Sequence, residues 1–330
     1  MLKKFFSIIS NNKLLCFCFL FLGLFIGALA VDFSGVGKGT VSLDYLQSNS
    51  AKMFQTGDKT WISYDNPIVE VIALNDFKCS YCDDSEYKEF IEQNITPTVE
   101  IKDLDVNSQE GKTFIKTFNI KAIPAYIFSE EIKNIKDFSK ISDIFKQEGE
   151  FLILESYKTG ALTPLKVLDN PLKSSDAKIT IVEISDYECP YCKKAAGALK
   201  DALKDYPESE VKLIHKHLPL DFHNFALDAS VAAECARRQE KFSQMNDILF
   251  GSQFDSEDDI KNFAKNIPGL NYLQFEECFD YRATEAIVEF DKNWAMDFNI
   301  YATPTFLVNE RYIGGAISAE EFKKIIEEEL

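Results

Sequence analysis

Two pairs of cysteines, each separated by two residues, follow runs of sequence that have the pattern of a buried β-strand. Cys79-Ser80-Tyr81-Cys82 comes after residues 68–74, and Cys189-Pro190-Tyr191-Cys192 comes after residues 178–184. Short apolar runs rich in Ile and Val favour strands buried inside a sheet. A helix-like stretch follows each pair, so both pairs are predicted to lie at strand-to-helix junctions.

The order of predicted elements around the two cysteine pairs is also repeated. The first pair is followed by strand-like, helix-like and Pro124-containing strand-like segments, then by a predicted helix over residues 135–147 and a strand at 151–154. The second pair is followed by a strand at 211–215, a long helical section over 225–298, a strand after Pro304 and a final helix. Gly, Pro and Ser without periodicity mark a linker at 159–177. We therefore expect domains at 61–158 and 178–330.

The N-terminus predicts export. Three lysines precede an uncharged apolar run over residues 14–31, which ends in Ala28-Leu29-Ala30. This pattern is typical of a signal peptide with a cleavage site, and the run is also long enough to be retained as a membrane anchor. Either reading of residues 1–31 places the rest in the periplasm or another extracytoplasmic space, after a tether at 32–60. We expect membrane contact only through this N-terminal segment.

Charge excludes one class of partner. The chain has a formal net charge of −17. A surface of this sign repels the phosphates of nucleic acids and of anionic membranes. No nucleic-acid partner is therefore expected.

The cysteine chemistry follows from the compartment and the spacing. Two of the eight cysteines lie in the apolar N-terminal run, which leaves an even number in a chain bound for an oxidising space. A cysteine at a helix N-terminus is stabilised as the thiolate, which is the attacking species in disulfide exchange. Cys79 and Cys189 are therefore the expected nucleophiles. Cys82 and Cys192 are the expected resolving thiols.

Metal binding is the competing reading. Paired CxxC motifs can hold zinc, but zinc ribbons separate the pairs by only about 15–20 residues, and these two motifs lie in different predicted domains. His215, His217 and His223 have no carboxylate cluster near them in sequence that would complete a site. A purely structural bond within so small a loop stabilises little. We therefore expect neither a metal nor a cofactor.

Residues 178–330 resemble a DsbA-type thioredoxin-fold domain. The resemblance rests on residues 181–192, on His217-Leu218-Pro219-Leu220 and on Thr303-Pro304-Thr305-Phe306. Residues 67–158 resemble a thioredoxin- or glutaredoxin-like domain through their CxxC and Ile123-Pro124. The fold class that this resemblance implies is α/β, with two tandem thioredoxin-like domains, the second carrying a helical insertion.

The resemblance also implies a substrate groove beside each dithiol. In these families a late cis-proline faces the dithiol, a position that Thr303-Pro304 matches well and Ile123-Pro124 less closely. The groove of the second domain would also include Pro190 and Tyr191.

A buried acid is implied six residues before the first cysteine, where it relays protons to the resolving thiol. The second domain has Glu183 at that position, and the first has Ala73. The alternative for Glu183 is a surface acid at a strand edge.

Cys235 and Cys278 lie in the predicted helical insertion. Related DsbA-like proteins often join these helices by a disulfide, so the resemblance implies a structural bond between the two. A third redox relay is the alternative.

Local charge separates the two dithiols. Lys193 and Lys194 follow Cys192 and favour a thiolate at Cys189, whereas Asp83 and Asp84 follow Cys82 and oppose one nearby. The second dithiol is therefore predicted to be the more oxidising couple.

The expected function is thiol–disulfide exchange with thiol-containing substrate proteins, in the direction of disulfide formation. The resemblance implies a membrane quinone-linked reoxidase as the electron partner. An isomerase or reductase would work from the reduced dithiol instead. A non-catalytic module that holds clients in the groove around Pro304 or Pro124 is the alternative from a different class.

Overall fold

The computed structural model describes residues 67–154, 164–174 and 176–330. It also gives the backbone of five short strands, β1 (Phe19–Phe21), β2 (Leu24–Ile26), β3 (Leu29–Val31), β4 (Lys52–Thr56) and β5 (Lys59–Ser63). The expected signal or anchor at 1–31, the tether at 32–60 and part of the linker at 159–177 lie otherwise outside the described residues. No helix among the described residues is long and apolar enough to cross a membrane.

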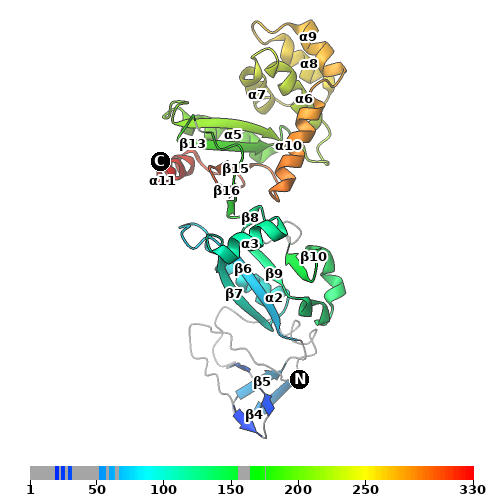
Figure 1. Ribbon diagram of the computed structural model, residues 1–330. Coiled ribbons are helices and arrows are strands. Elements are labelled where there is room, and N and C mark those ends of the chain that lie inside the picture. The colour runs from blue at the N-terminus through cyan, green and yellow to red at the C-terminus, as the bar shows by residue number, and fades with distance from the viewer. Residues whose placement is uncertain are drawn as a thin grey trace. The chain divides into compact units, whose positions relative to one another are not determined.

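The chain divides into two compact units (Figure 1). Unit 1 comprises Met1–Ile120 and Pro124–Leu162, and unit 2 comprises Lys121–Ile123 and Thr163–Leu330. Mixed sheets and helices occur in both, so the expected α/β class is confirmed.

Unit 1 is built on a five-stranded sheet with the order β10-β11-β9-β6-β7. β6 and β7 run parallel, and the other neighbouring pairs are antiparallel. Parallel neighbours need a crossover connection, which α2 supplies. The elements are β6 (Val69–Asn75), α2 (Ser85–Asn94), β7 (Val99–Asp105), α3 (Gln109–Phe118), β9 (Ala125–Phe128), β10 (Phe145–Glu148) and β11 (Phe151–Leu154).

The helix predicted over residues 135–147 is wrong. The segment forms short 3₁₀ turns, η1 (Glu130–Asn134), η2 (Phe138–Lys140) and η3 (Ser142–Ile144), and then enters β10. Asp137 has φ of 64°, a left-handed conformation that a continuous right-handed helix does not contain.

Unit 2 contains a six-stranded sheet with the order β14-β13-β15-β16-β12-β8. β13 and β14 are parallel and are joined through α5, while β15 returns antiparallel to β13. The strands are β8 (Ala122–Ile123), β12 (Lys166–Val167), β13 (Ile179–Ser185), β14 (Val211–His217), β15 (Thr305–Val308) and β16 (Arg311–Gly314).

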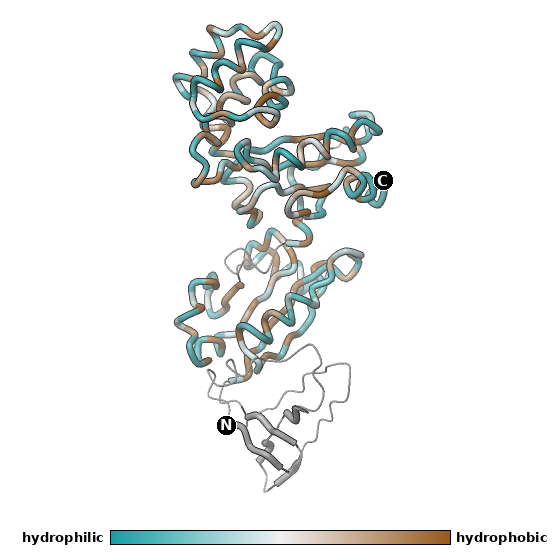
Figure 2. The backbone as a smooth tube through the Cα atoms, turned by 180° about the vertical axis from the view of Figure 1, so that it is seen from behind, coloured by the Kyte–Doolittle hydropathy of each residue, from teal (hydrophilic) through white to brown (hydrophobic). Residues whose placement is uncertain are grey.

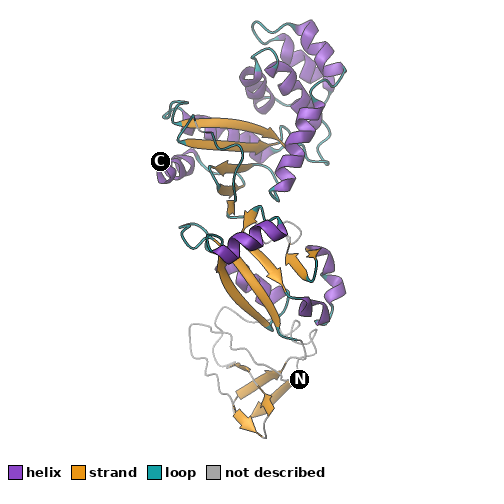
Figure 3. Ribbon diagram, viewed as in Figure 1, coloured by secondary structure: helices purple, strands orange, loops and turns teal. Residues whose placement is uncertain are grey.

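The long helical section of unit 2 is divided into five helices (Figure 3). The helices are α5 (Pro190–Leu203), α6 (Ala226–Arg237), α7 (Phe242–Gly251), α8 (Glu257–Lys265), α9 (Tyr272–Asp280), α10 (Glu285–Asp297) and α11 (Ala319–Glu329). Hydrophobic and hydrophilic residues alternate along these helices (Figure 2), as expected of helices with one buried face.

The four central strands repeat between the units. The order β7-β6-β9-β11 in unit 1 matches β14-β13-β15-β16 in unit 2, with the same strand directions. All seven residues of β13 are buried because helices cover both faces of this strand. Ile181 packs on the side of α5 and α11, and Val182 packs on the side of α10. Central strands that are covered on both faces have nearly continuous apolar sequences, so they can be predicted from the sequence.

Replacing either of two helical glycines by alanine should change the stability of its unit, in opposite directions. A Cβ on Gly111 in α3 would lie 2.1 Å from the backbone oxygen of Asp105, whereas a Cβ on Gly197 in α5 would meet nothing within 4 Å. Gly111→Ala should lower the stability of unit 1 by about 1–3 kcal/mol or more, since the backbone it strikes must move. Gly197→Ala should stabilise unit 2 by up to about 1 kcal/mol.

Native-state hydrogen exchange of the amides in β6 and β13 measures the stability of each unit separately. Unchanged protection of β6 in Gly111→Ala would contradict the packing of α3 against the end of β7.

Candidate functional site

The second cysteine pair lies where the central strand of unit 2 meets a helix. β13 ends at Ser185, the Asp186 side chain accepts a hydrogen bond from the Glu188 amide at 2.8 Å, and the Cys189 amide donates to the Asp186 carbonyl at 3.2 Å. This turn makes Cys189 the N-cap of α5, with Pro190 at the first helical position. Proline suits that position because its missing N–H has no partner there anyway. The unpaired amides of the first turn favour a thiolate at Cys189.

The loop before β15 closes over this dithiol. The Cys189 thiol donates to the carbonyl of Thr303 at 3.6 Å. The Thr303–Pro304 bond is cis, and no other cis peptide occurs in the described part of the chain. Pro304 is buried, whereas Pro190 and Tyr191 are exposed, Tyr191 by 66%. Of the residues assigned to the second groove, Thr303 thus lies against the nucleophile and Tyr191 faces solvent.

Cys192 lies behind Cys189 and has no solvent exposure. Burial raises the pKa of its thiol to about 12, against the opposing influence of the Ser185 and Thr303 hydroxyls. Neither hydroxyl has a hydrogen-bond partner of normal geometry. Cys192 is therefore a protonated thiol at neutral pH and must lose a proton before it can attack.

Glu183 is buried in β13, so the alternative of a surface acid is wrong. It is 3% exposed, and its register neighbours are His215 on β14 and Phe306 on β15. Its Oε2 lies 3.4 Å from His215 Nδ1, while its Oε1 has no partner. Alternate residues of a strand share a face, so Glu183 lies on the same side as Ile181 and Ser185, which is the side of α5 and Cys192.

A groove of about 610 Å³ between α5 and α7 reaches this acid. Glu183 lines it together with Leu199, Leu213 and Phe250, and with two lysines of α5. The buried carboxyl thus lies beside a solvent-accessible space on the flank of α5.

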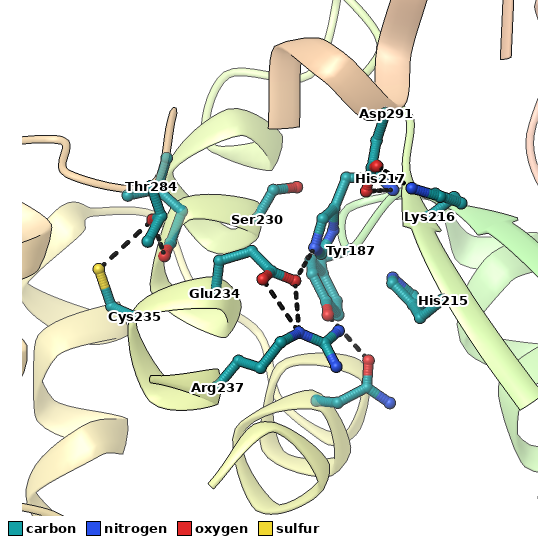
Figure 4. Close-up of polar contacts among 12 residues, drawn as sticks. Tyr187, His215, Lys216, His217, Ser230, Glu234, Cys235, Arg237, Thr284 and Asp291 are labelled. Carbon is teal, nitrogen blue, oxygen red and sulfur yellow. Dashed lines mark hydrogen bonds and ion pairs between the residues drawn. The ribbon is translucent and has the colours of Figure 1, made fainter. Parts of the chain in front are cut away.

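Two histidines of β14 lie in a buried polar cluster with Tyr187 and Glu234 (Figure 4). His215 of this cluster neighbours Glu183. His215 stacks on Tyr187 with ring centroids 5.7 Å apart, and His217 Nε2 lies 2.9 Å from Glu234 Oε1. The Arg237 guanidinium donates to both oxygens of Glu234 at 3.0 Å. Burial lowers the pKa of His217 despite this contact, whereas for Glu234 the neighbouring His217 and Arg237 lower a pKa that burial alone would raise.

The third histidine, His223, lies outside this cluster and contacts the turn before Cys189. His223 Nδ1 lies 2.8 Å from Asp186 Oδ2, so it supports the turn before Cys189. Within the residues that the structure describes, no group of three or more His, Cys, Asp or Glu side chains could hold a metal ion.

Cys235 and Cys278 are joined by a disulfide bond between α6 and α9, with an S–S distance of 2.03 Å. Thr284 Oγ1 lies 3.5 Å from the Cys235 sulfur and donates to the carbonyl of Val231 (Figure 4). The bond lies in the buried core of the helical insertion. Cys235 follows Glu234 in α6, so the disulfide is one residue from the histidine cluster.

The first dithiol differs in its relation to the helix. Cys79 and Cys82 form a disulfide, and the Cys79 amide donates to the Asp76 carbonyl at 3.1 Å, as in the equivalent turn of unit 2. However, α2 begins only at Ser85, so the prediction that Cys79 lies at a helix N-terminus is wrong. Residues 80–84 form turn and loop instead, which leaves Cys79 without the unpaired amides that surround Cys189.

The proline assigned to the first groove also has different surroundings. Ile123 is fully buried in β8, where it pairs with Lys166 of β12 in the sheet of unit 2. Pro124 is half-buried, and its preceding peptide bond is not cis. The cis geometry expected at Ile123–Pro124 is therefore absent.

Sequence reasoning missed two groups of residues near the dithiols. Tyr187 and Glu234 complete the histidine cluster, and a tertiary contact over 17 residues between His217 and Glu234 leaves no sequence signal. In unit 1, Asp84 binds Lys88 and Tyr126. Here the sequence signal is the acidic run after Cys82, which predicts a repulsive charge but not these two contacts.

Comparisons with known proteins agree with the fold of unit 2. Residues 174–328 match the family model described as thioredoxin. Sequence relatives include the Na(+)/H(+) antiporter NhaA 3 of Salinispora tropica, 35% identical over 44% of this chain and 22% of the relative, and NhaA 1 of Mycobacterium sp. (strain KMS), 33% identical over 46% and 25%. The chain spans a quarter or less of the length of these curated relatives.

Solved structures that resemble this chain cover about half of it. BdbD of Bacillus subtilis in its oxidised form is 28% identical, covers 48% of this chain and 90% of its own, and has a TM-score of 0.42. A thioredoxin-like oxidoreductase of Silicibacter pomeroyi DSS-3 is 22% identical, with 48% and 89% coverage and a TM-score of 0.43. The family match and the strand order agree that residues 174–328 form a thioredoxin-like domain.

Proposed function

We propose that this chain is an exported protein thiol–disulfide oxidoreductase, and that Cys189 and Cys192 are its principal dithiol. The observation that carries the proposal is the pairing of a cysteine at the N-cap of α5 with a fully buried cysteine one turn further on. Cys189 is 5% exposed and Cys192 is not exposed at all, which supports exchange of the first sulfur with a client and of the second only with the first.

The oxidative direction uses the two sulfurs in turn. A client thiolate attacks Cys189 of the disulfide form, a mixed disulfide forms, and Cys192 leaves as a thiolate that takes up a proton. A second client thiolate then attacks the client sulfur of the mixed disulfide, and Cys189 leaves as the thiolate that α5 stabilises. The client loses two electrons, and the dithiol gains them. Glu183 is proposed to pass the proton to and from Cys192, supported by its burial on the α5 side of β13 and by the adjacent groove.

The partners and location belong to the same proposal. Substrates are proteins with free thiols, and a membrane quinone-linked reoxidase accepts the electrons. The chain works in the periplasm or another extracytoplasmic space, with residues 14–31 as signal or anchor. An isomerase or reductase would use the same dithiol from the reduced state, and the potential distinguishes them: about −120 mV for an oxidase and about −270 mV for a reductant.

The two thiols of the reduced second dithiol should differ in reactivity with pH. Cys192 should remain unmodified by iodoacetamide at neutral pH and react only as the pH approaches its pKa of about 12, since burial holds it protonated. In urea it should react near pH 8.5, the ordinary value for a free cysteine. Mass spectrometry of the peptides gives the modified fraction. Labelling of folded Cys192 at pH 7 would show that the thiol is not buried as described.

Replacing single cysteines should separate attack from resolution. Cys189→Ser should abolish oxidation of a reduced dithiol peptide by unit 2. Reduced Cys192→Ser, mixed with the disulfide form of that peptide, should accumulate a mixed disulfide through Cys189, because no resolving thiol remains. Both are measured in a Cys79→Ser, Cys82→Ser background, so that only one dithiol is active. Retained client binding with no exchange in the Cys189-containing parent would favour the non-catalytic module instead.

A further inference from the structure

Unit 1 lacks an acid at the strand position that Glu183 occupies in unit 2, but a buried acid, Asp84, contacts a neighbour of that position. Ala73 lies in β6 between Asp103 on β7 and Tyr126 on β9, just as Glu183 lies in β13 between His215 and Phe306. Neighbours in register share a face of the sheet. The side chains of Asp103 and Tyr126 thus border the space above the Ala73 methyl group.

Both of these neighbours are connected to the Asp84 carboxylate, Tyr126 directly and Asp103 through Lys88. The Tyr126 hydroxyl donates to Asp84 Oδ2 at 3.2 Å. Lys88 Nζ lies 3.0 Å from Asp84 Oδ1 and 2.6 Å from Asp103 Oδ1, and so joins the two acids. Ala73, Tyr126 and Ile91 of α2 belong to one buried cluster. Asp84 therefore extends from the start of α2 toward residue 73 of β6, on the face of the strand where a side chain longer than that of Ala73 would lie.

The surroundings of Asp84 are those of a buried charge with partners. Its side chain is only 9% exposed, and Cys82, two residues earlier, is 6% exposed. Burial acts to lower the pKa of Lys88, but its bonds to Asp103 and Asp84 raise it above the ordinary value, so the lysine remains a cation. Burial and the Asp84 charge hold the pKa of Tyr126 far above its ordinary value, so the phenol keeps its proton.

Helix capping does not account for this acid. Asp84 is the N-cap residue of α2, yet its side chain caps no backbone amide. Such a bond from a backbone amide is accepted by the N-cap side chains of α3, α8, α9 and α11, which are Ser108, Ser256, Asn271 and Ser318. A free aspartate at this position would normally cap the helix. Both oxygens of Asp84 instead face Lys88 and Tyr126, on the sheet side.

We infer that Asp84 is the proton acceptor of the first dithiol, and that it replaces from the helix side the acid missing at Ala73. The inference rests on the proposed redox role of Cys79 and Cys82. In the step concerned, Cys79 is bound to a client through a mixed disulfide and Cys82 is a thiol. The Cys82 S–H proton moves to the Asp84 carboxylate, the Cys82 sulfur attacks Cys79, the S–S bond between them forms, and the client sulfur leaves as a thiolate. The client bond is reduced by the two electrons that the dithiol loses.

The test uses the full chain with Cys189→Ser and Cys192→Ser, reduced and mixed with the chromogenic disulfide dithiobis(nitrobenzoate). Attack by Cys79 releases the first nitrothiolate, and attack by Cys82 on the mixed disulfide releases the second, so stopped-flow absorbance separates the two steps. The same chain with Cys79→Ser and Cys82→Ser gives the background from other thiols. Asp84→Asn should slow the second phase about 10²-fold at neutral pH, the usual contribution of a positioned base. The first phase should change far less.

The pH profile distinguishes proton transfer from structure. In the parent the second phase should rise with one ionisation and then level off, whereas in Asp84→Asn it should keep rising with hydroxide. Asp84→Glu should restore much of the rate. Asp83→Asn is the matched control, because Asp83 is the exposed neighbour with the same charge and binds only the start of α2. Its second phase should equal that of the parent.

Lys88→Gln provides an independent measurement should Asp84→Asn fold poorly. Lys88 holds Asp84 Oδ1 at 3.0 Å, so loss of this cation should leave the carboxylate a stronger proton acceptor and speed the second phase relative to the first. Equal second phases and equal profiles in the parent, Asp84→Asn and Lys88→Gln would overturn the role of Asp84 alone. A parent that shows no release above the background would instead overturn the redox role of Cys79 and Cys82.

Discussion

The parallel pairing of β13 with β14 is the constraint on which the C-terminal unit depends. Parallel neighbours cannot be joined by a tight turn, so the chain must cross over the sheet, and α5 makes this crossing. The start of α5 is therefore fixed at the carboxyl end of β13. Cys189 takes the N-cap position of the helix, and the unpaired amides of the first turn are available to its sulfur. The loop that carries Thr303 and Pro304 closes the same end, because β15 runs antiparallel on the other side of β13.

The same pairing occurs in unit 1, but the helix begins later. β6 and β7 are parallel and α2 crosses between them, yet five residues separate Cys79 from the first residue of α2. The dithiol of unit 1 thus lies in a turn, with buried aspartates at both ends of it, Asp76 and Asp84. The two units have the same central strand order, but the electrostatic environment of Cys79 and Cys82 therefore differs from that of Cys189 and Cys192. The charge difference expected from Lys193 and Asp83 is reinforced by this difference in backbone.

Much of the architecture could be predicted from the sequence because central strands with both faces covered give continuous apolar runs. β6, β13 and the strand after Pro304 were found in this way, and the repeat followed from them. The start of α2 and the turns over residues 130–144 could not be predicted, since capping and left-handed residues such as Asp137 decide helix boundaries locally. At the candidate site, spacing and resemblance predict Cys189, Cys192 and Glu183. The contacts of Glu234 and Tyr126 depend on chain segments 17 and 42 residues from their partners, and no local pattern encodes them.

The disulfide between α6 and α9 limits the conditions in which the C-terminal unit can work. It closes a loop of 43 residues around the core of the helical insertion, and such a closure removes much of the freedom of the unfolded chain. Cys235 is bonded to Glu234, whose carboxylate holds His217 beside Glu183 and His215. Surroundings reducing enough to open this bond would therefore loosen the polar cluster behind the dithiol as well as the insertion. The Cys235–Cys278 bond thus sets an upper limit on how reducing a compartment can be if this unit is to keep its structure there.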